Sequence, residues 1–220
     1  LLYTVLQWLM GRPEVPGAAA HFRVLPGLFG ALAVGAGLWG YHWAVVRDES
    51  RNTAGPLPAV YGIYRYLVAG LGLGTLAVGL VVAFAVVLGL LVPAPGQPLV
   101  TSQWWRNPLT LAVTLLAVGI PLWSFYWFGA QRDAKTAPRE ERVALSRRVF
   151  LYLVFGIAVL LSLGNLSALL FIFLRALLDG QMSTQLVHQA RWAIGMLLMA
   201  GAVSGYYWLV LREDHRAIAP

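Results

Sequence analysis

Five long apolar stretches constrain the fold of this chain more than any other feature. They contain no Asp, Glu or Lys and cover residues 24–46, 59–92, 109–128, 149–178 and 192–211. A helix needs about 20 mainly apolar residues to cross the ~30 Å hydrocarbon core of a bilayer. A soluble domain carries about 25% charged residues, whereas only 11% are charged here and 59% are hydrophobic. The sequence therefore predicts an all-α integral membrane protein.

The first ten residues form a shorter apolar stretch. Residues 1–10 are apolar but long enough for only half a span, and the first residue is Leu rather than Met. We expect the chain to start inside its first helix, with its true N-terminus missing. The sequence thus predicts about six transmembrane helices, of which the first is truncated.

An aromatic motif closes three of the apolar stretches. Each copy has an aromatic residue or His before a final Trp, then an Arg and an Asp: Tyr41-His42-Trp43 with Arg47 and Asp48, Phe125-Tyr126-Trp127 with Arg132 and Asp133, and Tyr206-Tyr207-Trp208 with Arg212 and Asp214. Successive final tryptophans lie 84 and 81 residues apart, and the segment 152–156 echoes 66–70 at a distance of 86 residues.

A period of this length holds two helices, so all copies should cross the membrane in the same direction. We therefore predict three parallel two-helix repeats, 1–58 (N-terminally incomplete), 59–146 and 147–220, within a single membrane domain.

Basic residues predict the orientation of these repeats. Cytoplasmic loops of membrane proteins carry an excess of Lys and Arg. The end of the helices that carries the motif has eleven: Arg47, Arg51, Arg65, Arg132, Lys135, Arg139, Arg142, Arg147, Arg148, Arg212 and Arg216. The other end has five: Arg12, Arg23, Arg106, Arg175 and Arg191. We therefore expect a cytoplasmic C-terminus.

The motif has a simple physical interpretation as a membrane anchor. Tyr and Trp favour the headgroup level, and an Arg one turn later can extend toward lipid phosphate. The Asp would then lie in water and pair with its neighbouring Arg or with a basic residue of the next unit. The alternative is functional: the pairs Arg47–Asp48, Arg132–Asp133 and Arg212–Asp214 could form a charge gate or a ring that docks a partner.

Few polar residues lie at membrane depth. Asn165, with Ser162 beside it, needs a hydrogen-bond partner in hydrocarbon. An interhelical hydrogen bond is the first interpretation, and the lining of a substrate cavity is the alternative. Pro121 should kink its helix. The spacings Gly70–Gly74 and Gly201–Gly205 favour helix-packing faces.

The sequence contains no recognisable catalytic motif, and we predict that the protein is not an enzyme. It has no Cys, which excludes disulfides, thiol catalysis and cysteine-bound metals. We predict neither a metal nor a cofactor; a haem or chlorin held through His42 is the weaker alternative, because Tyr126 and Tyr207 take the same place in the other copies. The net charge of +7 marks the cytoplasmic side rather than a nucleic-acid partner.

The aromatic-Trp…Arg-Asp helix ends and the helix starts at Tyr66 and Tyr152 resemble an uncharacterised bacterial membrane-protein family, a domain of unknown function. The resemblance implies a multi-pass protein of the bacterial cytoplasmic membrane and brings no catalytic residues. We expect a non-enzymatic accessory or scaffold subunit that packs against membrane lipids and against other membrane subunits or itself. The alternative is a transporter of small solutes or lipids with a cavity between the repeats.

Overall fold

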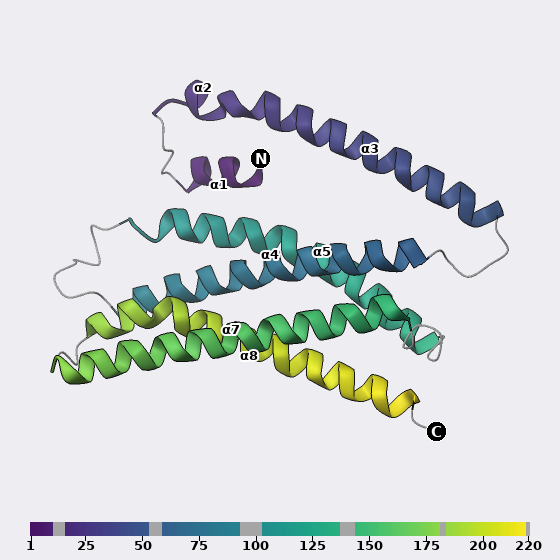
Figure 1. Cartoon of the computed structure of the whole chain (residues 1–220). Helices are drawn as coiled ribbons and strands as arrows, with labels where there is room; N and C mark the ends of the chain where they lie inside the picture. Colours follow the sequence, from purple (N-terminus) through teal and green to yellow (C-terminus); the bar gives the residue numbers. More distant parts are fainter. Residues whose placement is uncertain (11–15, 53–58, 93–102, 137–143, 181–183, 219–220) are drawn as a thin grey trace. The chain divides into compact units, whose positions relative to one another are not determined.

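The chain folds into helices that belong to two compact units. The computed structural model describes residues 1–10, 16–52, 59–92, 103–136, 144–180 and 184–218. The units are Leu1–Gly62 and Ile63–Pro220. All regular structure in the described residues is helical (Figure 1): α1 (Leu2–Leu9), α2 (Ala18–His21), the 3-10 helix η1 (Phe22–Val24), α3 (Leu25–Asn52), α4 (Ala59–Leu91), α5 (Arg106–Thr136), α7 (Leu145–Leu178) and α8 (Thr184–Ile218).

Five of these helices are long and apolar enough to cross a membrane, as the sequence predicts. Helix α4 ends within one residue of its predicted stretch, 59–92. Helices α5 and α8 continue well beyond their predicted stretches, 109–128 and 192–211, to Thr136 and Ile218. The added residues are mainly the polar ones that follow each apolar stretch. Helix α1 has eight residues, which is too short for a span.

The first unit is held together around the short helices. The Nε2 atom of His21 lies 2.8 Å from the carbonyl oxygen of Thr4, and the ring of Trp8 packs against His21 and Phe22. Helix α3 continues from there, and its apolar window buries no residue. Its large side chains, such as Leu32 and Leu38, are exposed.

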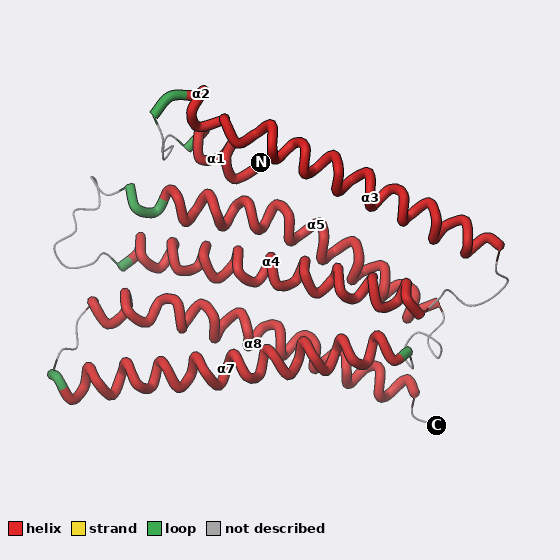
Figure 2. The backbone as a smooth tube through the Cα atoms, turned by 45° about the horizontal axis from the view of Figure 1, so that its top comes forward, coloured by secondary structure: helices red, strands yellow, loops and turns green. Residues whose placement is uncertain are grey.

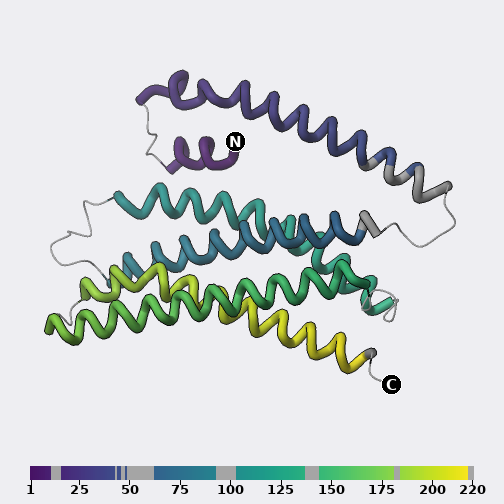
Figure 3. Tube along the Cα trace, in the orientation of Figure 1, coloured from purple at the N-terminus to yellow at the C-terminus, as the bar shows by residue number. Residues whose placement is uncertain are grey.

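The second unit is a bundle of four long helices around one core. Consecutive helices run in opposite directions, as the colour order along the tube shows (Figure 3). Helices α7 and α8 lie side by side (Figure 2). Each helix contributes large buried side chains to the same cluster, including Tyr66 from α4, Trp127 from α5, Phe150 from α7 and Tyr207 from α8.

Helices α4 and α5 cross at their glycines. A Cβ atom added to Gly72 would lie 2.5 Å from the backbone nitrogen of Trp123, and one added to Gly119 would lie 2.5 Å from the backbone nitrogen of Leu76. Real Cβ atoms do not approach that closely, so both positions require glycine. Of the two glycines in the predicted packing spacing, Gly70 faces α7, since an added Cβ atom would lie 3.4 Å from the ring of Phe150, whereas Gly74 has no neighbour within 4 Å.

Candidate functional site: a buried arginine network

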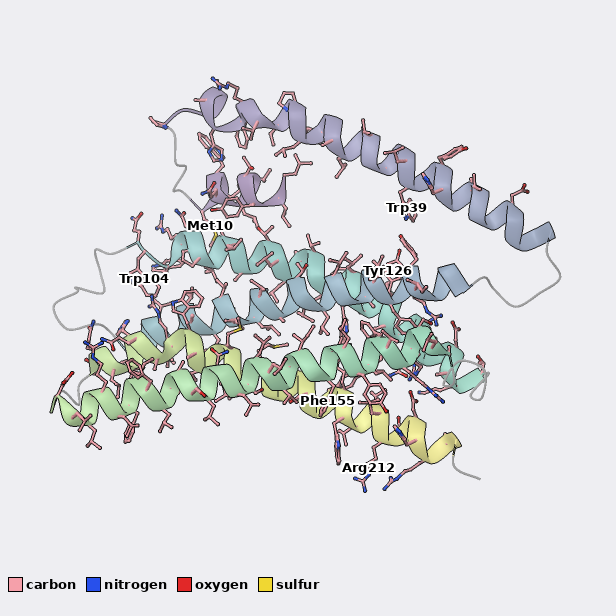
Figure 4. The ribbon with its side chains drawn as sticks, viewed as in Figure 1. Met10, Trp39, Trp104, Tyr126, Phe155 and Arg212 are labelled. Carbon is pink, nitrogen blue, oxygen red and sulfur yellow. The ribbon has the colours of Figure 1, made fainter. Side chains whose placement is uncertain are left out.

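One end of the second unit gathers most of its charged and aromatic side chains. The ends of α5 and α8, which carry the motif, meet there with the beginnings of α4 and α7. Tyr126, Phe155 and Arg212 mark this part of the bundle in Figure 4. The helix ends beyond the apolar stretches thus form a polar layer joined to the core.

Arg147 occupies the centre of this layer. Its side chain is 1% exposed, and its Nε atom donates to Oδ2 of Asp214 at 2.7 Å. Its Nη2 atom donates to Oδ1 of the same carboxylate at 3.2 Å and to Oε1 of Gln131 at 3.0 Å. The guanidinium also lies 5.7 Å from the ring centroid of Trp127. A two-pronged ion pair with a further acceptor compensates part of the loss of hydration of this buried Arg, and its Nη1 atom is buried without a hydrogen-bond partner among the described residues.

A second ion pair joins α4 to α5 in the same way. Nη1 of Arg65 donates to Oδ2 of Asp133, and the Arg65 guanidinium lies 5.2 Å from the ring centroid of Tyr66. Arg65 is buried, whereas the Asp133 side chain is 57% exposed. Water can therefore solvate Asp133, and this pair should contribute less to stability than the buried Arg147–Asp214 pair.

Two aromatic residues of the motif lie inside the bundle, and their burial corrects the predicted anchoring role for both. Trp127 is 0% exposed and Tyr207 is 1% exposed, so neither ring can contact lipid headgroups. The indole N–H of Trp127 donates to the hydroxyl of Tyr206 at 2.7 Å, and that of Trp123 donates to the hydroxyl of Tyr207 at 3.2 Å. Trp208 remains about half exposed and keeps a surface position.

We expect Trp127→Phe to lower the free energy of unfolding by about 0.5–1.5 kcal/mol, the usual contribution of one hydrogen bond. Phenylalanine keeps the ring in the core but lacks the N–H that donates to Tyr206. The measurement is unfolding of the purified protein in mixed micelles by titration with a denaturing detergent. Trp208→Phe is the matched control, because that ring is about half exposed; equal losses in both variants would contradict the assignment.

The predicted Arg–Asp pairs are not formed between sequence neighbours in the described residues. Asp133 and Asp214 pair instead with Arg65 and Arg147. Each partner lies at the beginning of the preceding helix, 68 and 67 residues earlier, and not in the next unit. Asp214 is buried, so the expectation that it lies in water is also wrong.

The Arg residues of the predicted pairs have other surroundings. Arg132 is exposed, and the Arg212 guanidinium lies 5.4 Å from the ring centroid of Trp208. Asp48 is exposed on α3, and the side chain of Arg47 lies outside the described part of the structure.

Sequence reasoning missed Arg65, Arg147 and Gln131 as members of the network. One signal could have found the two arginines. Arg65 and Arg147 lie 82 residues apart, and Asp133 and Asp214 lie 81 residues apart. Matched spacings of opposite charges at opposite ends of helix pairs favour ion pairs within each pair.

The predicted polar residues at membrane depth bond to their own helices. Asn165 donates from Nδ2 to the carbonyl of Leu161 at 2.8 Å, and Ser162 donates to the carbonyl of Ala158 at 2.9 Å. Pro121 is exposed inside α5, and the hydroxyl of Ser124 donates to its carbonyl at 3.2 Å. The predicted interhelical hydrogen bond of Asn165 is thus replaced by one within α7.

His42 lies on the exposed surface of α3, with its Nδ1 atom 2.8 Å from the carbonyl oxygen of Leu38. Within the described residues, no group of three or more His, Asp and Glu side chains gathers as a metal site would require. A haem or chlorin bound through His42 remains the weaker prediction.

At the other end of the bundle, Arg191 lies between two indole rings. Its guanidinium is 5.3 Å from the ring centroid of Trp104 and 5.8 Å from that of Trp192. His188 contacts the carbonyl of Val92 nearby. This end joins α4, α8 and the residues before α5, and it contains no ion pair between helices in the described residues.

The fold and the network define a helical protein with five helices that could cross a membrane, consistent with a multi-pass membrane protein. Its second unit is joined at one end by internal ion pairs. The chain belongs to the family DUF5671, a domain of unknown function, which matches residues 62–216. The expected resemblance to an uncharacterised domain family is thereby confirmed. No curated protein and no solved structure matches the chain.

Proposed function

We propose that this chain is a non-enzymatic multi-pass membrane protein that serves as an accessory or scaffold subunit. The observation on which the proposal depends is that the apolar side chains of α3 are not buried. No residue in its apolar window is buried, and five glycines on it (Gly27, Gly30, Gly35, Gly37 and Gly40) have no neighbour within 4 Å. Glycine weakens a helix by about 1 kcal/mol relative to Ala, whereas small residues allow a neighbouring membrane helix to approach closely. A Gly-rich, unburied helix suits contact with another subunit.

The internal use of charge in the second unit supports the same proposal. Arg65 and Arg147 are both paired with carboxylates of the bundle, and Asn165 and Ser162 bond to their own backbone. The two ion pairs hold helices together, and the two polar side chains bond within α7. Buried charge is thus used to join helices of the bundle.

We further propose three parallel two-helix repeats, in the cytoplasmic membrane of a bacterium and with a cytoplasmic C-terminus. The ion pairs support the repeat, because they join equivalent ends of α4–α5 and α7–α8 at separations of 68 and 67 residues. The distribution of Lys and Arg, eleven against five, supports the orientation. The resemblance of the helix ends to those of an uncharacterised bacterial membrane-protein family supports a location in a bacterial membrane.

Transport of a small solute or lipid is the second candidate. It would use Asn165 and Pro121 as parts of a cavity between the repeats. The hydrogen bond of Asn165 to Leu161 counts against it, because a cavity-lining amide would direct its polar atoms toward the cavity. The exposed position of Pro121 gives it no additional support.

Native mass analysis of the protein, extracted gently from its own membranes, tests the proposal. We expect a stoichiometric assembly with at least one other membrane protein, because α3 needs a partner surface. Recovery as a monomer or homo-oligomer, with a reproducible bound solute or lipid, would contradict the subunit role and favour transport. Reconstitution in liposomes is the control. Movement of a solute across the liposome membrane by the purified protein by itself would also contradict the subunit role and favour transport.

A further inference from the structure

Arg191, at the end of the bundle opposite the network, has no carboxylate partner among the described residues. The connections at this end of the second unit, residues 92–105 and 179–183, contain a single carboxylate, Asp179. Oδ2 of Asp179 lies 3.6 Å from Nε of Arg175, and both side chains are exposed. By contrast, the two buried arginines of the network each have a carboxylate within their own helix pair. Positive charge is therefore in excess at the Arg191 end.

Aromatic rings and a glycine hold the Arg191 side chain in place. Its guanidinium lies 5.3 Å from the ring centroid of Trp104 and 5.8 Å from that of Trp192. A Cβ atom added to Gly89 of α4 would lie 2.9 Å from Nη1 of Arg191 and 2.6 Å from Cη2 of Trp104. Glycine at this position therefore makes room for both side chains against α4. Figure 4 shows Trp104 at the end of the second unit opposite Arg212.

The rings do not provide hydrogen-bond acceptors for this guanidinium. A guanidinium has five N–H donors in one plane, whereas an aromatic ring attracts its charge through the ring face. Nε of Arg191 is buried and has no acceptor among the described residues, although the residue as a whole is partly exposed. A cation held in this way calls for an anionic acceptor that approaches from the surface of the bundle.

The site lies at the level where the apolar stretches of two helices begin and end. Arg191 directly precedes the stretch 192–211, and Gly89 lies three residues before the end of the stretch 59–92. Trp side chains favour the headgroup level of a bilayer, and Trp192 is 44% exposed. Lipid phosphate lies at the same level, and the planar fork of an Arg can donate two parallel hydrogen bonds to a phosphate. The depth of the site thus matches its charge.

We infer that Arg191 binds the phosphate of an anionic phospholipid at this end of the bundle. Trp104 and Trp192 hold the guanidinium at the level of the headgroup, and Gly89 provides the space that this arrangement needs. The acyl chains of the lipid cover exposed apolar side chains of the helices. The inference rests on the proposed membrane location and does not depend on the subunit role.

Lipid binding to the purified full chain tests the inference. The protein is freed of lipid in an uncharged detergent and titrated with phosphatidylglycerol, and native mass spectrometry counts the bound lipids. We expect one saturable site that Arg191→Gln weakens about tenfold, as loss of a hydrogen bond between charged groups does. Arg175→Gln is the matched control, because it removes an exposed charge at the same end, and it should leave the affinity unchanged.

Two further titrations identify the part of the lipid that the site recognises. A diacylglycerol with the same acyl chains lacks the phosphate, so Arg191→Gln should not alter its binding. Inorganic phosphate in excess should not displace phosphatidylglycerol, because it has no acyl chains to add to the contact. Displacement by inorganic phosphate would assign the site to a free anion and overturn the assignment to a lipid.

Gly89→Ala tests the geometry of the site without removing its charge. The new Cβ atom must displace Nη1 of Arg191 and the ring of Trp104, so we expect weaker binding of phosphatidylglycerol. Both displaced groups are the far ends of side chains, and the helices should remain folded. Gly74→Ala is the matched control on the same helix, because its Cβ atom would meet nothing within 4 Å. Circular dichroism before addition of lipid checks that each variant is folded.

Two results would overturn the inference: unchanged affinity for phosphatidylglycerol in Arg191→Gln, or equal weakening by Arg191→Gln and Arg175→Gln, which would indicate attraction by positive charge in general. These results are distinct from failure of the proposed function. Recovery from the membrane without a partner subunit would contradict the subunit role and leave the Arg191-dependent binding intact. A lipid that Arg191→Gln removes belongs to this site and is not evidence for transport.

Discussion

Arg147→Leu is expected to lower the free energy of unfolding of the second unit by about 3–5 kcal/mol, the usual cost of breaking a buried ion pair from one side. The substitution leaves the Asp214 carboxylate buried without its cation and leaves Gln131 without the Nη2 donor. It also removes the cation from the face of Trp127, a contact of about 0.5–2 kcal/mol. Titration with a denaturing detergent in mixed micelles gives the midpoint and the free energy.

A double-mutant cycle distinguishes the pair from its individual members. Arg147→Leu with Asp214→Leu should cost much less than the sum of the two single changes, because replacing a buried ion pair by apolar groups is often neutral. Arg65→Leu is the matched control and should cost about 0–1 kcal/mol from its ion pair, since water reaches Asp133. Additive losses in the double variant would show that Arg147 and Asp214 act independently.

Gly119→Ala is expected to destabilise the bundle by about 1–3 kcal/mol, as overpacking of a tight core does. The new Cβ atom would lie 2.5 Å from the backbone nitrogen of Leu76. Backbone cannot rotate away as a side chain can, so α4 and α5 must separate along their crossing. The same detergent titration measures the loss, and Gly72→Ala should behave alike because its Cβ would meet the backbone of Trp123.

Gly74→Ala is the matched control on the same helix as Gly72. Its added Cβ would meet nothing within 4 Å, so the higher helix propensity of Ala should stabilise the protein by up to about 1 kcal/mol. Opposite signs for Gly72→Ala and Gly74→Ala are therefore expected. Stabilisation by Gly119→Ala would contradict the close crossing of α4 and α5.

Hydropathy predicted the long helices well, because a helix pairs the backbone N–H and C=O groups of an apolar stretch within the stretch itself. The predicted stretch 59–92 and α4 (Ala59–Leu91) differ by one residue. Helices α5 and α8 were predicted to end too early. Charged residues follow Trp127 and Trp208, and hydropathy gives no signal that such residues are helical. Asp133 and Asp214 join these helical ends to the neighbouring helices.

The network itself could not be predicted from one helix at a time. An aromatic residue at the end of an apolar stretch is equally compatible with a headgroup position and with a core position, and only packing shows that Trp127 is in the core. The same holds for glycine. Gly70, Gly72 and Gly74 have similar neighbours in the sequence, yet among these three only Gly72 lies against the backbone of another helix. Long-range contacts decide both cases.

The separation of 68 and 67 residues between the paired charges has a consequence for synthesis. Arg65 and Arg147 each leave the ribosome a full helix, a connection and most of a second helix before their carboxylates. Until then each guanidinium lacks this carboxylate and must remain hydrated. Each of these two pairs is therefore completed only after its second helix has been made, so the ion pair belongs to a whole helical hairpin and to neither helix by itself.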